Sequence, residues 1–280
     1  MKKLTRIIFV MLLLLNPLTK SEAAYIGISD SNPGQGSAVA AFFTGDTKIK
    51  SAVLDGKPAS FFEYKNFNAV VFPVSATAKP GNCKLKVIFE DGSFFDKQIA
   101  VKTTRFQKVV LGIPEELNMT PKTLTSNLQI QNNTISEVVD LVSDKTFFNQ
   151  PFGLPLADNR KIGSRFGEIR QTGSEQIRHL GVDFTAPLGA SVYAINSGVV
   201  KKVYFDTIYG NSILIDHGQG IFSAYFHMDK TIAKEGEEVK KGTKIGTVGK
   251  TGYATAPHLH LSVKINGISV DPIKFSSVFK

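Results

Sequence analysis

The sequence predicts a mainly β protein with an N-terminal β-sandwich, a short helical bridge and a C-terminal antiparallel β domain. Its 280 residues suffice for about two buried cores, and 24 glycines punctuate short runs rich in Val, Ile and Phe. Helical periodicity is confined to the middle of the chain. We therefore predict a signal peptide over 1–23, a β domain over 24–104, a helical linker over 105–150 and a second β domain over 151–280.

The first residues have the composition of a secretory signal peptide. Basic residues precede an apolar run from Ile7 to Leu15, which is too short to span a bilayer as a helix. Ser21-Glu22-Ala23 then offers small residues to a signal peptidase. We expect cleavage after Ala23 and export, with a periplasmic location preferred over release from the cell. No cysteine stands directly after the cleavage site, so we expect no lipoprotein anchor and no other membrane anchor.

The net charge suggests an anionic partner. It is +9, and it falls to +6 once residues 1–23, with four positive residues and one negative, are removed. In an exported protein we expect attraction to an anionic envelope polymer or a membrane surface rather than to nucleic acid. A generically basic secreted protein is the alternative. Cys83 is the single cysteine, so no internal disulfide is predicted.

Residues 24–104 contain short β-rich runs separated by turns. Asp55-Gly56 and Asp91-Gly92 mark hairpins, because such turns require positive φ. Five runs at this spacing predict an immunoglobulin-like sandwich. The segment has no histidine, so we expect a spacer, wall-docking or regulatory module. The runs are Ser37–Phe43, Lys48–Leu54, Ala69–Val74, Lys84–Glu90 and Ser93–Val101.

The period changes in the linker. Thr120-Pro121 is typical of a helix start, with proline at the first helical position. After Asn132-Asn133, Thr134-x-x-Glu137 has the pattern of a capping box. We therefore predict two short helices. The apolar face of the second comprises Ile135, Val138, Val139 and Val142.

Beyond Pro151 the strands return, separated by glycine turns. This alternation predicts an antiparallel, nearly all-β domain of about 130 residues. The expected strands are Val192–Ile195, Val199–Phe205, Ser212–Asp216, Ile221–His227 and His258–Lys264.

Two histidines occur one residue apart in the last of these strands. His258 and His260 alternate with Leu259 and Leu261, so the two imidazoles point to one face and the apolar side chains to the other. Such a pair can reach one metal, or one ligand and one proton-transfer partner. The strand pattern does not decide which histidine does which. A chance pair beside a core strand is the alternative.

His179 and Asp183 supply two more donors. Gly181 and its β-branched neighbour favour a loop that delivers His179 and a strand that begins at about Asp183. A neutral imidazole and a carboxylate are both good zinc ligands. With one nitrogen from the later pair they would make three protein ligands, which leaves a fourth position for water, as a catalytic zinc requires.

The remaining histidines are His217 and His227. Phe226 should face opposite to His227, so burial of Phe226 would aim His227 at the other face of the sheet. Alone, His227 would be a structural histidine. His217 lies in a turn with Asp216 and Gly218, and we expect a structural or solvent role for it.

Together these residues resemble peptidase family M23, the LytM- or lysostaphin-type zinc endopeptidases, over about 151–275. The resemblance rests on motifs in the right order: Gly163-Ser164-Arg165-Phe166-Gly167, His179-x-x-x-Asp183, Tyr225-Phe226-His227, and Gly249-Lys250-Thr251-Gly252 before Pro257-His258-Leu259-His260. It implies an antiparallel β domain of the M23 type that binds one Zn²⁺ per chain. The implied zinc ligands are His179, Asp183 and His260, and the implied catalytic pair is His227 and His258.

For an exported member the resemblance implies hydrolysis of peptide cross-links in peptidoglycan. The expected bond is D-alanyl–meso-diaminopimelate, cut during wall remodelling or shaping of the cell, with D-alanine carboxypeptidase activity as a second reaction. The alternative is a non-catalytic activator of cell-wall amidases, and a third is an enzyme that attacks other bacteria. All five implied residues are present, which favours an enzyme. We also expect the N-terminal sandwich or the helical bridge to lie across the groove and limit access.

Overall fold

The computed structural model of the protein describes residues 24–113, 119–157 and 161–280; the predicted signal peptide lies outside them. Two four-stranded antiparallel sheets form the N-terminal part, in the orders β1-β2-β6-β5 and β4-β3-β7-β8. These are the A-B-E-D and C′-C-F-G orders of an immunoglobulin fold, which confirms the predicted sandwich. The strands are β1 (Ala24–Ile28), β2 (Ala38–Thr44), β3 (Ile49–Leu54), β4 (Lys57–Pro58), β5 (Ser60–Tyr64), β6 (Phe67–Pro73), β7 (Gly81–Phe89) and β8 (Phe94–Val101).

The sandwich core follows from the alternation of apolar residues along its strands. Val39, Phe43, Leu85 and Ile99 are fully buried between the two sheets. The turn between β3 and β4 takes positive φ at Asp55 (47°) and Gly56 (76°), as the Asp-Gly signal predicts.

The linker contains one strand and one helix in its described part. Strand β9 (Lys108–Val110) pairs in parallel with β11 (Ile169–Thr172), a departure from the all-antiparallel expectation. Helix α1 (Pro121–Val139) begins as predicted: Pro121 is in the first turn, and the Thr120 hydroxyl accepts from the Thr123 N–H at 3.1 Å.

The prediction of two linker helices was wrong, because α1 is continuous through Asn132-Asn133. The Thr134 hydroxyl donates to the Ile130 carbonyl, 3.3 Å away, and does not cap a second helix. Ile135 and Val139 are buried against strands of the C-terminal sheet. That burial outweighs the low helix propensity of the Asn-Asn-Thr run.

The C-terminal part is built on a ten-stranded sheet. Its main path is β10-β13-β20-β17-β16-β15-β18; β14 and β19 pair with each other and join it through β17, and β21 joins through β20. The elements are β10 (Lys161–Ser164), β12 (Glu175–Arg178), β13 (Val182–Thr185), β14 (Ser191–Tyr193), β15 (Gly198–Asp206), β16 (Gly210–Gly218), β17 (Ile221–Thr231), β18 (Glu238–Val239), β19 (Lys244–Val248), β20 (His258–Ile265), β21 (Ile268–Val270) and α2 (Pro272–Phe275).

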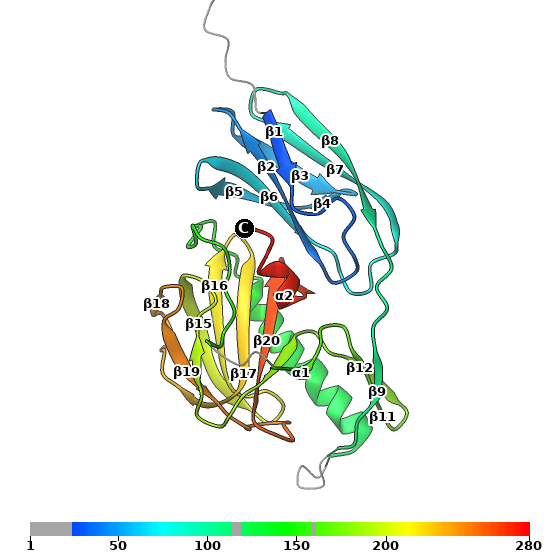
Figure 1. Cartoon of the computed structure of the whole chain (residues 1–280), viewed down its shortest axis with the longest axis vertical. Helices are drawn as coiled ribbons and strands as arrows, with labels where there is room; N and C mark the ends of the chain where they lie inside the picture. Colours follow the sequence, from blue (N-terminus) through cyan, green and yellow to red (C-terminus); the bar gives the residue numbers. More distant parts are fainter. Residues whose placement is uncertain (1–23, 114–118, 158–160) are drawn as a thin grey trace, which may run out of the picture.

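The sandwich and the C-terminal part share one hydrophobic core. The outer face of the β1-β2-β6-β5 sheet contributes Phe62 and Tyr64, which pack on Phe148 and Phe279 from beyond the sandwich. The Tyr64 hydroxyl donates to the Phe279 carbonyl at 3.2 Å. The chain therefore ends between the two parts, where Figure 1 places its C-terminus.

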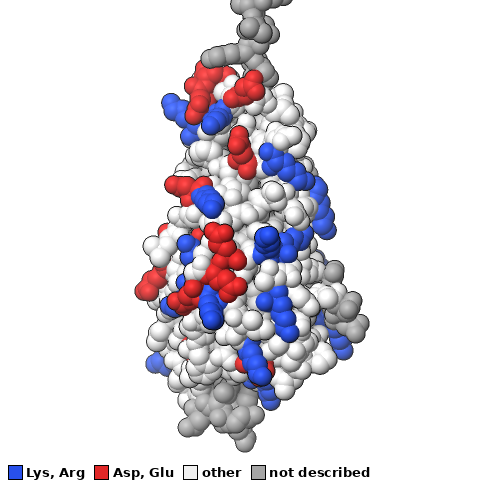
Figure 2. Space-filling model, turned by 90° about the vertical axis from the view of Figure 1, so that its left-hand side faces the viewer, with Lys and Arg blue, Asp and Glu red and all other residues white. Residues whose placement is uncertain are grey.

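The surface gives little guidance on partners. Acidic and basic side chains are intermixed on the side of the molecule that Figure 2 shows, so this face has no uniformly basic field. Neither α1 nor α2, the two helices in the described part of the chain, has the length and hydrophobicity that a bilayer crossing requires. Attraction to an anionic polymer stays a prediction.

Candidate metal centre

Strand β20 supplies two of the site histidines. Leu259 and Leu261 on its inner face are fully buried in the shared core. His258 and His260 are on the opposite face and line one cavity, as the alternation predicts. In the β13–β20 pairing Asp183 is directly opposite His260, so register alone places this carboxylate beside an imidazole.

His179 enters from the other side of the cavity. It follows strand β12, and its ring Nδ1 lies 2.9 Å from the Arg165 carbonyl in the Gly163–Gly167 turn. A carbonyl only accepts, so Nδ1 carries the hydrogen and Nε2 presents a lone pair to the cavity. Gly181 is required here: a Cβ at this position would lie 2.4 Å from His260 Nε2.

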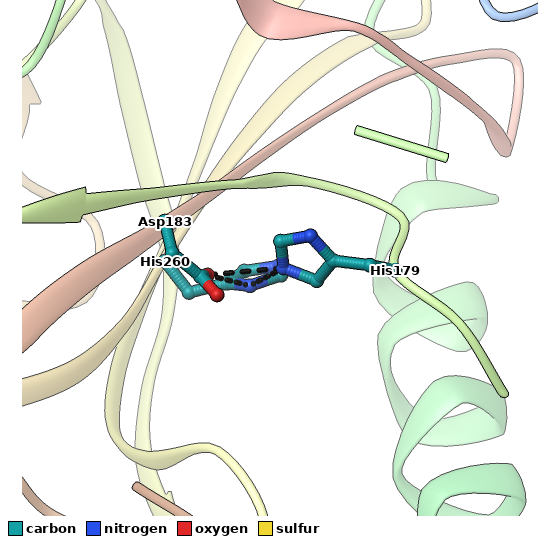
Figure 3. Close-up of side chains that lie close together, drawn as sticks. All are labelled: His179, Asp183 and His260. Carbon is teal, nitrogen blue, oxygen red and sulfur yellow. Dashed lines mark hydrogen bonds and ion pairs between the residues drawn. The ribbon is translucent and has the colours of Figure 1, made fainter. Parts of the chain in front are cut away.

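Three donor atoms converge at this point. His179 Nε2, His260 Nδ1 and Asp183 Oδ1 are 2.8 to 3.0 Å from one another. Figure 3 shows His179 facing the other two across the site. A neutral His179 with its hydrogen on Nδ1 places two acceptors, its Nε2 and the Asp183 oxygen, 3.0 Å apart, an arrangement that a cation would stabilise. The cluster therefore fits a metal ion bound by two imidazoles and one carboxylate.

The electrostatics of the cluster suit a cation. Burial raises the pKa of Asp183, but His179 and His260 outweigh it and hold that pKa well below its usual range. Burial lowers the pKa of His260 to about 4, against the opposing effect of Asp183. A deprotonated carboxylate and a neutral imidazole are the forms that bind a metal. Arg170 donates to the second Asp183 oxygen, Oδ2, at 2.7 Å.

His227 and His258 are at the edge of the cluster. Their ring centroids are 4.7 Å apart, and His258 Nε2 is 3.9 Å from Asp183 Oδ1. Each ring directs Nδ1 at a backbone carbonyl, that of Thr251 (2.9 Å) or that of Ala256 (2.8 Å). Both Nδ1 atoms therefore carry the hydrogen, and both Nε2 atoms are acceptors in the neutral rings.

The prediction that His227 and Phe226 face opposite sides of the sheet was wrong. Phe226 and His227 line the same cavity, although neighbours on a regular strand face opposite ways. His227 adopts a left-handed backbone, with φ of +60°, which turns its side chain to the face that Phe226 already occupies. Burial, followed by repulsion from His258 and His260, lowers the pKa of His227 to about 3.

His217 is separate from this cluster. It is fully buried, with Nδ1 2.7 Å from the Ser197 carbonyl and Nε2 2.8 Å from the Ser223 hydroxyl. Its hydrogen bonds are satisfied within the core, in agreement with the expected structural role.

The linker forms one wall of the cavity, which has a volume of about 350 Å³. Residues 111–112 and one face of α1 line it, and Figure 3 shows α1 beside the site, on the side of His179. The Tyr209 hydroxyl donates to Asn132 of α1 at 2.9 Å, and its ring stacks on Phe226. The α1 residues of the wall are Leu124, Leu128, Asn132 and Ile135.

Comparison with known proteins gives the family. Residues 177–272 match the family model described as peptidase family M23, and this range contains all five predicted site residues. Residues 177–272 belong to peptidase family M23. The Gly163–Gly167 motif lies before the matched range. It still contributes to the site, because the Arg165 carbonyl in this turn accepts a hydrogen bond from His179.

Individual M23 relatives match parts of the chain. The peptidoglycan DD-endopeptidase ShyC of Vibrio cholerae is 37% identical over 130 residues, which cover 46% of this chain and 29% of that protein. The DD-carboxypeptidase/endopeptidase Mpg of Neisseria meningitidis is 40% identical over 95 residues, 34% of this chain and 22% of that protein. The chain thus spans less than a third of either relative.

A solved structure extends the likeness to the N-terminal part. The structure of a putative peptidase M23 from Pseudomonas aeruginosa aligns over 89% of this chain and 96% of that one, with a TM-score of 0.63 and 24% identity. At this identity the match shows the fold alone.

Sequence reasoning missed Arg170 and Tyr209. No motif signals either residue: Arg170 reaches Asp183 through the position of β11, and Tyr209 contacts α1 across 77 residues of sequence. Both depend on long-range packing, which residue patterns do not report.

Proposed function

We propose that the chain is a zinc-dependent endopeptidase that hydrolyses peptide cross-links of peptidoglycan, with the D-alanyl–meso-diaminopimelate bond as its substrate. The observation that carries the proposal is the convergence of three donor atoms beside two histidines whose Nδ1 atoms are held by backbone carbonyls, which leaves Nε2 free in each ring. The M23 family match and the activities that ShyC and Mpg are named for support it. Trimming of terminal D-alanine is proposed as a second activity, and the periplasm as the place of action.

The proposed roles follow from position. His179, Asp183 and His260 would hold Zn²⁺, which would supply a Lewis acid and a coordinated water of lowered pKa. One of His227 and His258 would accept the proton of the attacking water at Nε2. Once protonated, that ring could hydrogen-bond the developing oxyanion and then return the proton to the leaving amine. Arg170, through Asp183 Oδ2, would fix the orientation of the carboxylate ligand.

We propose further that α1 restricts access to the groove. Each of the four central residues is less than 9% exposed: His179 4%, Asp183 8%, His227 6% and His260 8%. The scissile bond of a cross-linked polymer has to reach these buried residues, so displacement of this wall would widen the access. Helix α1 is the candidate, since its C-terminal half packs on the outer face of the sheet through one small apolar cluster.

The test is digestion of purified meso-diaminopimelate peptidoglycan with metal analysis of the same protein samples. Wild type should deplete dimeric muropeptides and contain about one zinc per chain. His260→Ala should lose both metal and cleavage, whereas His258→Ala should keep the metal and lose about 10²–10⁴-fold in rate. Metal bound by wild type without cleavage, even after α1 is loosened, would favour the amidase-activator alternative.

A further inference from the structure

One lysine of the cavity, Lys264, has no carboxylate partner within residues 24–113, 119–157 and 161–280. Three cationic side chains, Arg170, Arg178 and Lys264, line the cavity, against one carboxylate, Asp183. Arg170 is already engaged by Asp183 and Glu168. The Arg178 guanidinium stacks on Phe106 and donates to a backbone carbonyl. Among the described residues that line the cavity, Lys264 is therefore the cation left for a ligand.

In the part of the chain that the structure describes, the hydrogen-bond acceptors of Lys264 are neutral. Its Nζ donates to the Ser269 hydroxyl at 3.0 Å and to the Gly267 carbonyl at 3.5 Å. Asp140 at the end of α1 approaches the same turn, yet no ion pair joins it to Lys264 among the described residues. Burial removes part of the water around the Lys264 ammonium and thereby lowers the pKa of Lys264. A desolvated ammonium without a counter-ion attracts an incoming carboxylate.

The position of Lys264 relates it to the metal centre. It lies on β20 four residues beyond His260 and on the same face, hence about 13 Å along the strand. Ser262 lies between them, so that face of β20 lines the cavity from the donor cluster to the lysine. An extended peptide bound along β20 would place a group roughly four residues from the scissile bond beside Lys264.

We propose that Lys264, with Ser269, binds a free carboxylate of the peptide substrate and thereby selects acidic stem peptides over amidated ones. The identity of the peptide in this inference rests on the proposed function. The preference for a negatively charged ligand rests on the side chains that line the cavity. Lys264 is a specificity residue, since it lies too far from the donor cluster to touch the reacting atoms.

The experiment compares a cross-linked tetrapeptide dimer with free carboxyl groups and the same dimer converted to amides. Binding is measured by calorimetry with zinc-loaded His258→Ala protein, and cleavage with the wild-type active site. The free-acid dimer should bind about tenfold more tightly. Lys264→Gln should remove this difference, Lys264→Arg should keep most of it, and Lys244→Gln, which changes an exposed lysine, should leave it intact.

The outcomes separate the two proposals. The inference is overturned if the protein with Lys264 intact binds both dimers equally or binds neither. That result does not depend on any Lys264 variant. An equal loss for both dimers in Lys264→Gln, with a lower melting temperature, assigns the lysine a structural role and also overturns it. Preferential binding of the acid dimer without cleavage by wild type would support the carboxylate site and refute the endopeptidase proposal. Cleavage without discrimination would do the reverse.

Discussion

At the scale of single residues, the donor cluster depends on groups that orient its ligands. Arg170 contacts Asp183 Oδ2 at 2.7 Å and Glu168 at 3.2 Å, and its side chain is largely buried. We expect Arg170→Met to weaken zinc binding about 10–100-fold, because Asp183 loses the partner that fixes its orientation. Chelator competition measures the affinity, with Arg105→Met at an exposed position as the control. An unchanged affinity would show that Arg170 does not orient the ligand.

A second residue-scale prediction concerns pH. Burial lowers the pKa of His217 to about 4, whereas an unfolded histidine titrates near 6.5. Below pH 6.5 the unfolded chain therefore binds a proton that the folded chain does not. The free energy of unfolding should fall through this histidine by about 3 kcal/mol between pH 6.5 and pH 4.

Urea unfolding at pH 7.5 and pH 4.5, on wild type and His217→Gln, tests this contribution. The loss of stability at low pH should be about 2–3 kcal/mol smaller in the variant. The change with pH is the relevant quantity, because the variant loses hydrogen bonds at both pH values. Equal pH dependence in the two proteins would refute a neutral buried His217.

At the scale of elements, α1 decides whether the groove is open. Its C-terminal half is held by Ile135 and Val139, both 2% exposed against the outer face of β16 and β17. Ile135→Asp would bury a charge in this contact and undock the helix. If undocking removes about 1.4 kcal/mol or more of the free energy that favours the docked helix, we expect the rate of peptidoglycan cleavage to rise about tenfold or more.

Ile130→Asp is the matched control, because Ile130 is on the same helix and is 57% exposed. It should leave the rate unchanged. Hydrogen exchange of the α1 amides would report undocking independently of activity. If α1 exchanges faster in Ile135→Asp and cleavage falls or stays constant, then α1 is a fixed wall of the substrate groove and does not restrict access.

At the scale of the whole molecule, the sandwich and the M23 domain are packed as one unit. Their shared core contains an aromatic cluster around Tyr64, Phe148 and Phe279. We expect Phe279→Ala to cost about 3–5 kcal/mol and Phe61→Ala, at a 37% exposed position, far less. Calorimetry should give one cooperative transition for both parts, and two independent transitions would contradict the shared core.

The shared core also limits what a truncation can test. A chain beginning near Asn149 would lack the sandwich and expose Phe152 and Phe279, which are buried in the full chain. We expect such a chain to aggregate, so inactivity of the truncated protein would not bear on α1. Substitutions within α1 keep the core intact and are therefore the better test of access.

The sequence alone determined what depends on short-range patterns. Alternation along β20 placed His258 and His260 on one face, the Asp-Gly pairs marked turns, and Thr120-Pro121 marked the start of α1. The order of the motifs indicated the M23 family, and the structure brings together the five residues that the resemblance named. These features depend on the chemistry and spacing of near neighbours, which a single sequence contains.

Only the tertiary structure decided the features that depend on distant contacts. The left-handed backbone of His227, the continuity of α1 through Asn132-Asn133 and the pairing of Arg170 with Asp183 all arise from packing between segments far apart in the sequence. The burial of the sandwich face against the C-terminal tail is of the same kind. Such contacts override local propensity because each buries apolar surface or satisfies a buried polar group, and no local pattern records which partner will do so.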